Sequence, residues 1–414
     1  MIDTVEILRE LVALPSVNPM GRHDLTPVGE SRLTEYLFTR LTALGLSVGR
    51  QTVAPGRDNL WARLDGDKPP ESGGALLLLD AHQDTVPADN MTIEPWNPTV
   101  RAGRLYGRGA CDVKGGMAAM IAAMARLAVE RPAGMPTVLL SCLIDEEYQF
   151  GGVRALAAAW REGKGPKPRL PDAAIVAEPT GLDVIVAHKG VIRWCCHTHG
   201  RAAHSSQADR GDNAVYKMAQ VVTAIARYAR EVFATRPSHA LCGPYTLNVG
   251  TIRGGASVNI VPARCTIDLE IRVPPGGDPH SARSELIEYL AQEVDNPLPS
   301  PPAPLPSSRK RQREEGTLEH DPPYMDGPAL SDATNTALAE RLASVVREAT
   351  GGCQQRGVPY GTHAAFYSSL AIPAVVFGPG AIEQAHTADE WIPLDQLQQA
   401  AEILYRFIKS WRPL

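Results

Sequence analysis

Short apolar runs and amphipathic stretches alternate along the first half of the chain. Residues 4–14 and 30–45 repeat apolar positions at helical spacing, and residues 117–129 form an alanine-rich helical stretch. Four runs are apolar at nearly every position: Ala75–Leu79, Val138–Ile144, Ala173–Ala177 and Ala374–Phe377. Runs of this kind are typical of strands that are buried on both faces of a parallel sheet. The pattern predicts an α/β domain with a mixed, mostly parallel sheet flanked by helices.

The middle of the chain has a different pattern. Three stretches favour strands, and the last of them alternates apolar and polar residues: Val191–His199, Tyr245–Ile252 and Cys265–Val273. Residues 213–230 and 281–294 have helical periodicity. A sheet with one solvated face and two helices predicts a smaller α+β, ferredoxin-like domain. We place this domain at residues 185–321, inserted into a domain built from residues 1–184 and 322–414.

A proline-rich segment lies near the end of the predicted insertion. Six of the ten residues from Pro297 to Pro306 are proline, and the basic run Arg309–Arg313 follows at once. Because two acids, Glu314 and Glu315, come next, we interpret the segment as a solvated surface insertion.

Charge and cysteine content narrow the functional classes. The 414 residues include 41 basic and 46 acidic residues, for a net charge of −5, which disfavours partners such as nucleic acid or a membrane surface. No apolar run is long enough to cross a bilayer. The first residues carry acids rather than the basic residues of a signal peptide, and the seven cysteines include no C-x-x-C pair. We therefore expect a cytoplasmic protein with reduced thiols.

Acids and histidines follow the four apolar runs. The first run leads into Asp80–Asp84, the second into Asp145–Glu147, the third into Glu178, and the fourth is followed by His386. A glycine-rich loop before the alanine-rich helix adds Asp112. Since the carboxyl ends of parallel strands meet at one edge of a sheet, these side chains should converge there. Imidazole and carboxylate ligands without cysteine predict a site for zinc or a similar divalent ion.

The number of candidate ligands suits two ions that share a carboxylate. His82 and Asp84 are two residues apart in an extended segment, so Asp84 can hold the imidazole in its ligating tautomer. Glu146 and Glu147 are adjacent and should diverge, which leaves one as a ligand and the other as a base. The spacing does not decide which glutamate has which role.

The ordered motifs of the chain resemble those of one enzyme family. The segments that carry the resemblance are His82–Pro87, Gly107–Gly116, Asp145–Glu147, Ala177–Thr180 and Ala385–Glu390. They resemble the co-catalytic zinc family of acetylornithine deacetylase, succinyl-diaminopimelate desuccinylase, aminoacylase and glutamate carboxypeptidase. The resemblance runs from near residue 5 to near residue 410.

The resemblance implies a role for each site residue. Asp112 would bridge two Zn²⁺ ions, for which Co²⁺ or Mn²⁺ could substitute. The other metal ligands would be His82 and Glu178 at one ion and Glu147 and His386 at the other. Glu146 would be the general base, and Asp84 would orient His82. The expected chemistry is attack of a metal-bridging hydroxide on an amide carbonyl.

The resemblance also extends to the inserted domain, which is similar to a lid that mediates dimerisation in the family. His204, in Gly200–Ser205, would reach the site of the partner subunit and stabilise the oxyanion. Asn259 and Arg272 would hold the carboxylate of the substrate, and the planar fork of arginine suits that task. Thr362 and Gly378 are further candidates for contact with substrate. His363 departs from the family, in which an acid often stands at this position.

The most economical functional prediction is hydrolysis of the amide bond of an N-acyl-L-amino acid by an acetylornithine deacetylase-like homodimer. A dipeptidase, a carboxypeptidase or a succinyl-diaminopimelate desuccinylase is the alternative, because these enzymes differ only in pocket residues. A metal-binding relative without catalytic activity is an alternative of another class. No phosphate-binding G-x-x-x-x-G-K-[ST] loop and no G-x-S-x-G serine elbow occurs in the chain, so nucleotide and serine-hydrolase chemistry are disfavoured.

Overall fold

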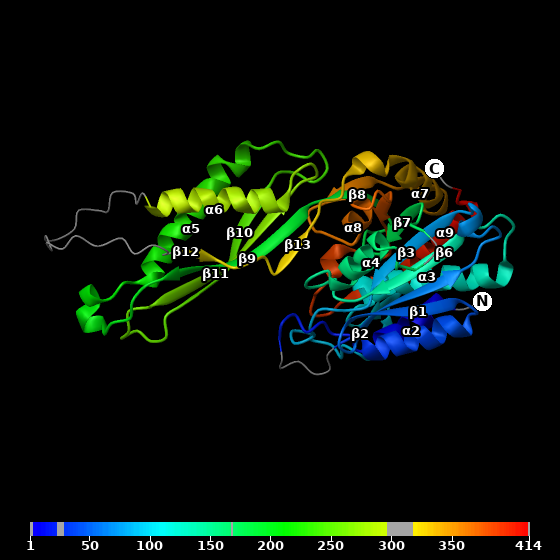
Figure 1. Cartoon of the computed structure of the whole chain (residues 1–414). Coiled ribbons are helices and arrows are strands. Elements are labelled where there is room, and N and C mark those ends of the chain that lie inside the picture. Colours follow the sequence, from blue (N-terminus) through cyan, green and yellow to red (C-terminus); the bar gives the residue numbers. More distant parts are fainter. Residues whose placement is uncertain (1–2, 23–28, 167–168, 296–317, 413–414) are drawn as a thin grey trace. The chain divides into compact units, whose positions relative to one another are not determined.

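The computed structural model describes residues 3–22, 29–166, 169–295 and 318–412. The proline-rich segment 297–306 and the basic run 309–313 lie outside the described residues. The chain forms two compact units, and each is treated by itself below (Figure 1). Unit 1 comprises Met1–His188 and Leu330–Leu414, and unit 2 comprises Lys189–Ala329.

The eight-stranded sheet of unit 1 has its apolar runs at the centre. The strand order is β1-β2-β6-β3-β7-β15-β8-β14. The central four are β6 (Thr137–Leu143), β3 (Leu76–His82), β7 (Ala173–Val176) and β15 (Ala374–Val376), and they run parallel to one another. The outer strands are β1 (Ser47–Ala54), β2 (Arg57–Leu64), β8 (Val184–His188) and β14 (Gln355–Val358). The predicted mixed, mostly parallel α/β sheet is confirmed, and its four apolar runs are adjacent strands buried on both faces.

Helices cover the sheet of unit 1. One group packs together: α1 (Thr4–Val12), α3 (Gly115–Glu130), α7 (Thr336–Thr350) and α9 (Leu394–Ser410). The remaining helices are α2 (Ser31–Ala43), beside β1 and β2, and α4 (Gly151–Arg161) and α8 (Ala364–Ser368), which contact each other. Helix α3 is buried almost all round, which explains why its sequence is rich in alanine rather than amphipathic. A small sheet of β16 (Trp391–Pro393), β5 (Arg104–Tyr106) and β4 (Thr99–Arg101) completes the unit.

Unit 2 has the strand order of a ferredoxin-like sheet. Its antiparallel strands lie in the order β10-β11-β9-β12, and β13 also pairs with β9. The strands are β9 (Gly190–His199), β10 (Thr246–Gly254), β11 (Arg264–Val273), β12 (Leu318–His320) and β13 (Met325–Gly327). Helices α5 (Ala214–Glu231) and α6 (Pro279–Asp295) pack on the sheet. Strand β11 alternates buried and partly exposed residues, so the predicted single core face is present.

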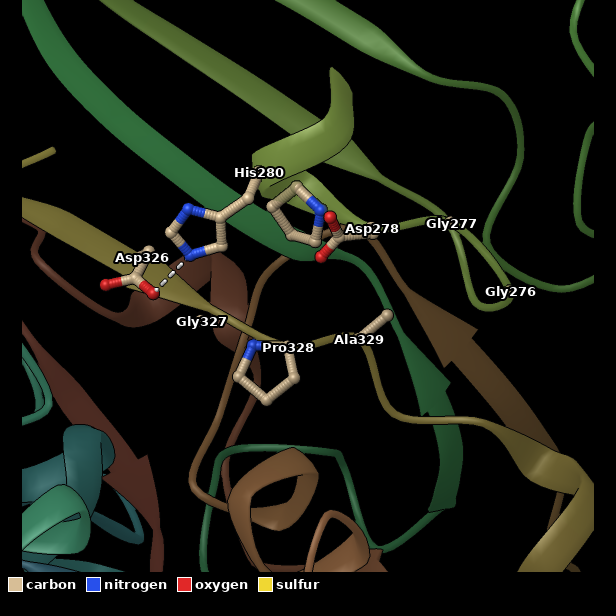
Figure 2. Close-up of a pocket in the computed structure, with 9 residues that line it drawn as sticks. Gly276, Gly277, Asp278, His280, Asp326, Gly327, Pro328 and Ala329 are labelled. Atoms are coloured by element: carbon tan, nitrogen blue, oxygen red, sulfur yellow. Dashed lines mark hydrogen bonds and ion pairs between the residues drawn. The ribbon is translucent and has the colours of Figure 1, made fainter. Parts of the chain in front are cut away.

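Unit 2 contains a small pocket beside the start of α6 (Figure 2). It is lined by residues 276–280 and 326–329. The imidazole of His280 lies across it, with Nε2 3.0 Å from a carboxylate oxygen of Asp326 in β13. The contact ties α6 to the last strand of the unit.

None of the helices in the described part of the chain combines the length and the apolar character needed to cross a bilayer. All seven cysteines are free thiols.

The side chain of Asn335 connects two strands of unit 1 that are joined by little else. Strands β8 and β15 are paired only through Val376 and Ile185. Asn335 is fully buried, and its amide donates to the carbonyl oxygens of Val186 in β8 at 2.8 Å and of Ala374 in β15 at 2.9 Å.

Replacement of this amide should therefore destabilise unit 1. In Asn335→Ala both carbonyls lose a buried donor, and the free energy of unfolding should fall by about 1–3 kcal/mol. Thr336→Ala, at the exposed neighbouring residue, should change it by no more than about 0.5 kcal/mol. Urea unfolding followed by circular dichroism measures both, and equal stabilities would contradict the bridging role.

Candidate metal centre

The ionisable residues of the central strands meet at one edge of the sheet. His82 is the last residue of β3, Glu146 and Glu147 follow β6, and Glu178 follows β7. These strands are parallel and adjacent, so their carboxyl ends lie side by side. The expected convergence of strand ends is therefore a consequence of the sheet order.

Asp112 lies between two histidines. Its Oδ1 is 3.1 Å from Nε2 of His82, and its Oδ2 is 3.3 Å from Nε2 of His386. The same Nε2 of His386 is 3.2 Å from Oε1 of Glu147. Each oxygen of the Asp112 carboxylate thus faces a different imidazole, which is the arrangement a bridging ligand requires.

The donor set fits a divalent ion. Ligand atoms of His82, Asp112 and Glu147 all lie within 4.8 Å of one another. Imidazole nitrogens and carboxylate oxygens are the donors that zinc and related divalent ions accept in open, catalytic sites. Glu178 is the fifth predicted ligand, and it is close enough to Asp112 and Glu146 for their charges to raise its pKa.

Burial and mutual repulsion dominate the electrostatics of the carboxylates. Burial raises the pKa of Glu146, Glu147 and Glu178, and the negative charge of neighbouring acids raises each pKa further. Burial also opposes ionisation of Asp112, but its hydrogen bonds to His386 and His82 outweigh burial and hold its pKa below the usual value. Positive charge is therefore required where these four carboxylates meet.

Two histidines lie against these carboxylates and counter their negative charge. Burial lowers the pKa of His386, but hydrogen bonds to Asp112 and Glu147 overcome it and raise the pKa to about 11. Burial also lowers the pKa of His82, but the hydrogen bond to Asp112 and the negative charge of Glu146 outweigh it and raise the pKa well above the usual value. A divalent ion at the same place competes with these protons, so ion binding should release them.

The orientation of His82 comes from the backbone of Asp84. Nδ1 of His82 is 2.9 Å from the carbonyl oxygen of Asp84 and 3.7 Å from its carboxylate. A proton on Nδ1 donated to that carbonyl leaves Nε2 free for an ion. The Asp84 carboxylate instead accepts from the backbone N–H groups of Glu146 and Glu147, both at 3.1 Å. Asp84 therefore positions the glutamate pair as well as the histidine.

Asn18 was not among the predicted site residues. Its side-chain amide donates to the carboxylates of Asp84 at 2.7 Å and Asp145 at 2.9 Å. This contact joins the N-terminal segment to the loops after β3 and β6. Neither a motif nor the spacing of the sequence indicated it, because the partners are 66 and 127 residues away.

Thr362 and Gly378 lie in tightly packed loops of unit 1. Thr362 is buried, and its backbone N–H donates to Nε2 of His188 at 3.3 Å. A Cβ on Gly378 would come within 2.5 Å of the carbonyl oxygen of Glu178, so only glycine allows this approach. Contact of either residue with a substrate stays a prediction.

His363 has a buried acidic partner. Its Nδ1 is 3.1 Å from Oδ2 of Asp80, which also accepts a hydrogen bond from the hydroxyl of Tyr367 at 2.5 Å. All three side chains are buried. The histidine that stands in place of the family's usual acid thus contacts an acid in β3 of this chain.

The other predicted substrate residues belong to unit 2, where two of them are neighbours. His204 pairs with Ile260 in an antiparallel bridge, and the backbone N–H of Ser205 donates to the carbonyl oxygen of Asn259 at 3.0 Å. Arg272 lies near the far end of β11 and donates to the carboxylate of Glu270 at 2.9 and 3.0 Å. Their roles stay predictions.

The chain matches the model of peptidase family M20/M25/M40 over residues 78–410. This match covers well over half of the chain. The chain belongs to this family. It is 31% identical over 412 residues to the acetylornithine deacetylase of Proteus mirabilis, which covers 98% of this chain and 96% of that protein. The acetylornithine deacetylase of Myxococcus xanthus is 31% identical over 381 residues and covers 91% of each protein.

Solved structures of M20 proteins share the fold. An M20 family metallo-carboxypeptidase from Sulfolobus solfataricus is 19% identical, with a TM-score of 0.75 and 99% of both chains covered. A dinuclear metal-binding M20 peptidase from Bacillus subtilis is 15% identical, with a TM-score of 0.66 and 98% of this chain and 96% of that chain covered. Membership of the family makes this chain a hydrolase of the metallopeptidase and amidohydrolase type.

Ion binding at the cluster should stabilise the protein. Zn²⁺, Co²⁺ or Mn²⁺ at a hundred times its dissociation constant should add about 2.7 kcal/mol and raise the melting temperature. A chelator should reverse the change. Asp112→Asn removes the shared negative charge and should lose most of the response in differential scanning calorimetry. A response of equal size in this variant would place the ions elsewhere.

Proposed function

We propose that the protein removes the acyl group from an N-acyl-L-amino acid, as an acetylornithine deacetylase does. The observation that supports this substrate class best is the 31% identity to curated acetylornithine deacetylases over 98% of the chain. The cluster of His82, Asp112, Glu147 and His386 supports a metal-dependent reaction.

Two divalent ions fit the proposed ligand set. Asp112 would be shared, His82 and Glu178 would hold one ion, and Glu147 and His386 the other. Bound there, the ions would polarise the amide carbonyl and lower the pKa of the attacking water, the chemistry that paired divalent ions supply in aminopeptidases. We propose Zn²⁺ as the native ion, with Co²⁺ or Mn²⁺ as substitutes.

Glu146 is the proposed general base. Its backbone is fixed by Asp84, and burial together with the charges of Glu147 and Asp112 raises the pKa of its carboxyl group. A carboxylate with a raised pKa takes a proton from water more readily and can return it to the leaving amine. Glu147, next to it, is engaged with His386 and suits the ligand role.

The substitution Glu146→Gln should lower turnover without loss of ion binding. The amide cannot accept a proton, so kcat should fall by about 10²- to 10⁴-fold while two ions per chain remain bound. Glu162→Gln, at an exposed glutamate paired with Lys164, is the matched control and should keep full activity. Steady-state kinetics and metal analysis of both variants test this, and a loss in Glu146→Gln of less than about tenfold would move the base elsewhere.

The proposed roles in unit 2 require two subunits. Asn259 precedes β11, whereas Arg272 lies eight residues along it from Arg264. At a rise of about 3.4 Å per residue, Arg264 and Arg272 are about 27 Å apart, too far for one substrate carboxylate to reach both ends of the strand. If Asn259 and Arg272 hold the same carboxylate, one of them comes from a partner. We propose a homodimer through unit 2, in which His204 accompanies Asn259 into the partner's site and stabilises the oxyanion.

A panel of substrates tests the proposed reaction. The metal-loaded protein should hydrolyse N-acetyl-L-ornithine with a kcat/KM well above that for N-succinyl-L,L-diaminopimelate, dipeptides or C-terminally cleaved peptides. Each substrate is supplied in turn with Zn²⁺, Co²⁺ and Mn²⁺. Preference for the succinyl substrate would instead indicate a succinyl-diaminopimelate desuccinylase, and preference for a dipeptide would indicate a dipeptidase. Full ion occupancy without hydrolysis of any substrate would identify a catalytically silent relative.

The seven free cysteines agree with a reducing compartment, and we propose the cytoplasm as the site of action. The proposed partner is a small N-acyl amino acid or short peptide, not nucleic acid or a membrane.

A further inference from the structure

Glu390 has no part in the proposed reaction, yet its carboxylate is fully buried beside the metal centre. Its Oε1 accepts from the backbone N–H groups of Cys111 at 2.9 Å and Asp112 at 3.0 Å. Its Oε2 accepts from the backbone N–H of Gly109 at 3.0 Å and from the guanidinium of Arg108 at 2.7 Å. One carboxylate therefore satisfies four donors of a single loop.

That loop carries the proposed bridging ligand. Three of the four donors are backbone N–H groups, and one belongs to Asp112 itself. Gly109 has a φ of +81°, and a Cβ there would come within 2.8 Å of Thr85, so only glycine suits this point of the loop. Charge-assisted hydrogen bonds from backbone N–H groups to a buried carboxylate are strong and directional.

Glu390 is also tied to a second ligand. It lies four residues after His386 in the same segment, and its own carbonyl oxygen accepts from the backbone N–H of Gly107 at 3.0 Å. Loop 107–112 and segment 386–390 are thus joined twice, although about 280 residues separate them in sequence. Asp112 lies at the end of this loop and His386 at the start of this segment, and the two proposed ligands contact each other.

We propose that Glu390 is a positioning residue of the metal centre, which holds Asp112 and His386 at the separation needed to share an ion. The inference rests on the proposed function for the presence of ions at these ligands. A purely structural alternative is that Glu390 serves only as the partner of Arg108, since both side chains of this ion pair are 1% exposed. The two readings differ in which substitution should weaken ion binding.

The test compares the zinc affinity of two variants of that ion pair with the wild type. Glu390→Gln halves the acceptor capacity facing the loop and removes its charge, and it should weaken Zn²⁺ binding about 10- to 100-fold, as loss of an outer partner of a ligand does. Arg108→Gln breaks the same ion pair but leaves the carboxylate on the three N–H groups, so it should lose clearly less affinity. Glu402→Gln, which breaks the surface pair with Arg126, is the control and should bind as the wild type does.

Affinity is measured by competition with a chromophoric chelator at low temperature, with circular dichroism to verify that each variant is folded. The Co²⁺ absorption spectrum, which reports ligand geometry, should change in Glu390→Gln and stay unchanged in Glu402→Gln. Wild-type affinity and spectrum in Glu390→Gln, or equal losses in Glu390→Gln and Arg108→Gln, would overturn the proposal. If Glu390→Gln does not fold, Glu390→Asp keeps the charge but is one methylene too short; its affinity should fall by at least about threefold, and unchanged affinity would overturn the proposal.

The zinc-affinity measurement uses no substrate, so it is independent of the proposed reaction. A wild-type protein that binds zinc but cleaves nothing in the panel refutes the proposed reaction alone, whereas failure of the affinity difference refutes the positioning role alone.

Discussion

The metal centre depends on one electrostatic constraint. Four carboxylates meet there, and they cannot all be ionised unless positive charge lies beside them. Asp112, Glu146, Glu147 and Glu178 meet at one buried edge of the unit 1 sheet, where burial and mutual repulsion raise the pKa of the three glutamates. Two histidines lie against Asp112 and Glu147 and balance part of the charge. A fold gains nothing in stability from such a concentration of acids unless positive charge is bound there. The arrangement is therefore best understood as a site built for ions.

Several surrounding residues hold the side chains of this cluster in position. Asp84 holds the glutamate pair through two backbone N–H groups, and Asn18 ties Asp84 to Asp145. Glu390 likewise holds the loop of Asp112, by accepting from three of its backbone N–H groups. These supporting groups are polar and buried, and they are paired with backbone groups more often than with other side chains. Ligand positions are thus held by hydrogen bonds from three distant parts of the chain, as precise ion binding demands.

The proposed role of unit 2 is of a different kind. Its predicted substrate residues lie near both ends of β11, with His204 and Asn259 together near one end and Arg272 at the other. A single unit cannot bring both ends to one small substrate, because the strand is stiff and extended. If Asn259 and Arg272 have the roles that the family resemblance implies, this separation is a structural reason for the proposed homodimer.

The amino-acid sequence alone predicted the four central strands of the unit 1 sheet and the identity of the candidate ligands. Continuous apolar runs identified the four central strands. A strand that is buried on both faces is apolar at nearly every position, and this can be recognised without knowing its neighbouring strands. Motif order then indicated His82, Asp112, Glu147 and His386, which the fold brings into contact. The three-residue strands β12 and β13 were not predicted, because so few residues carry no periodicity.

The contacts that support the site became visible only in the folded protein. The amide of Asn18, the pairing of His363 with Asp80 and the four donors around Glu390 left no mark in spacing or composition. Spacing did predict Asp84 as the partner of His82, but not that its backbone carbonyl makes the contact. Whether a hydrogen bond forms depends on differences of a few tenths of an ångström in the distance between two groups, which can be hundreds of residues apart in sequence. Hydrophobic periodicity is a local property of the chain, whereas the partner of a buried polar group is set only when the elements have packed.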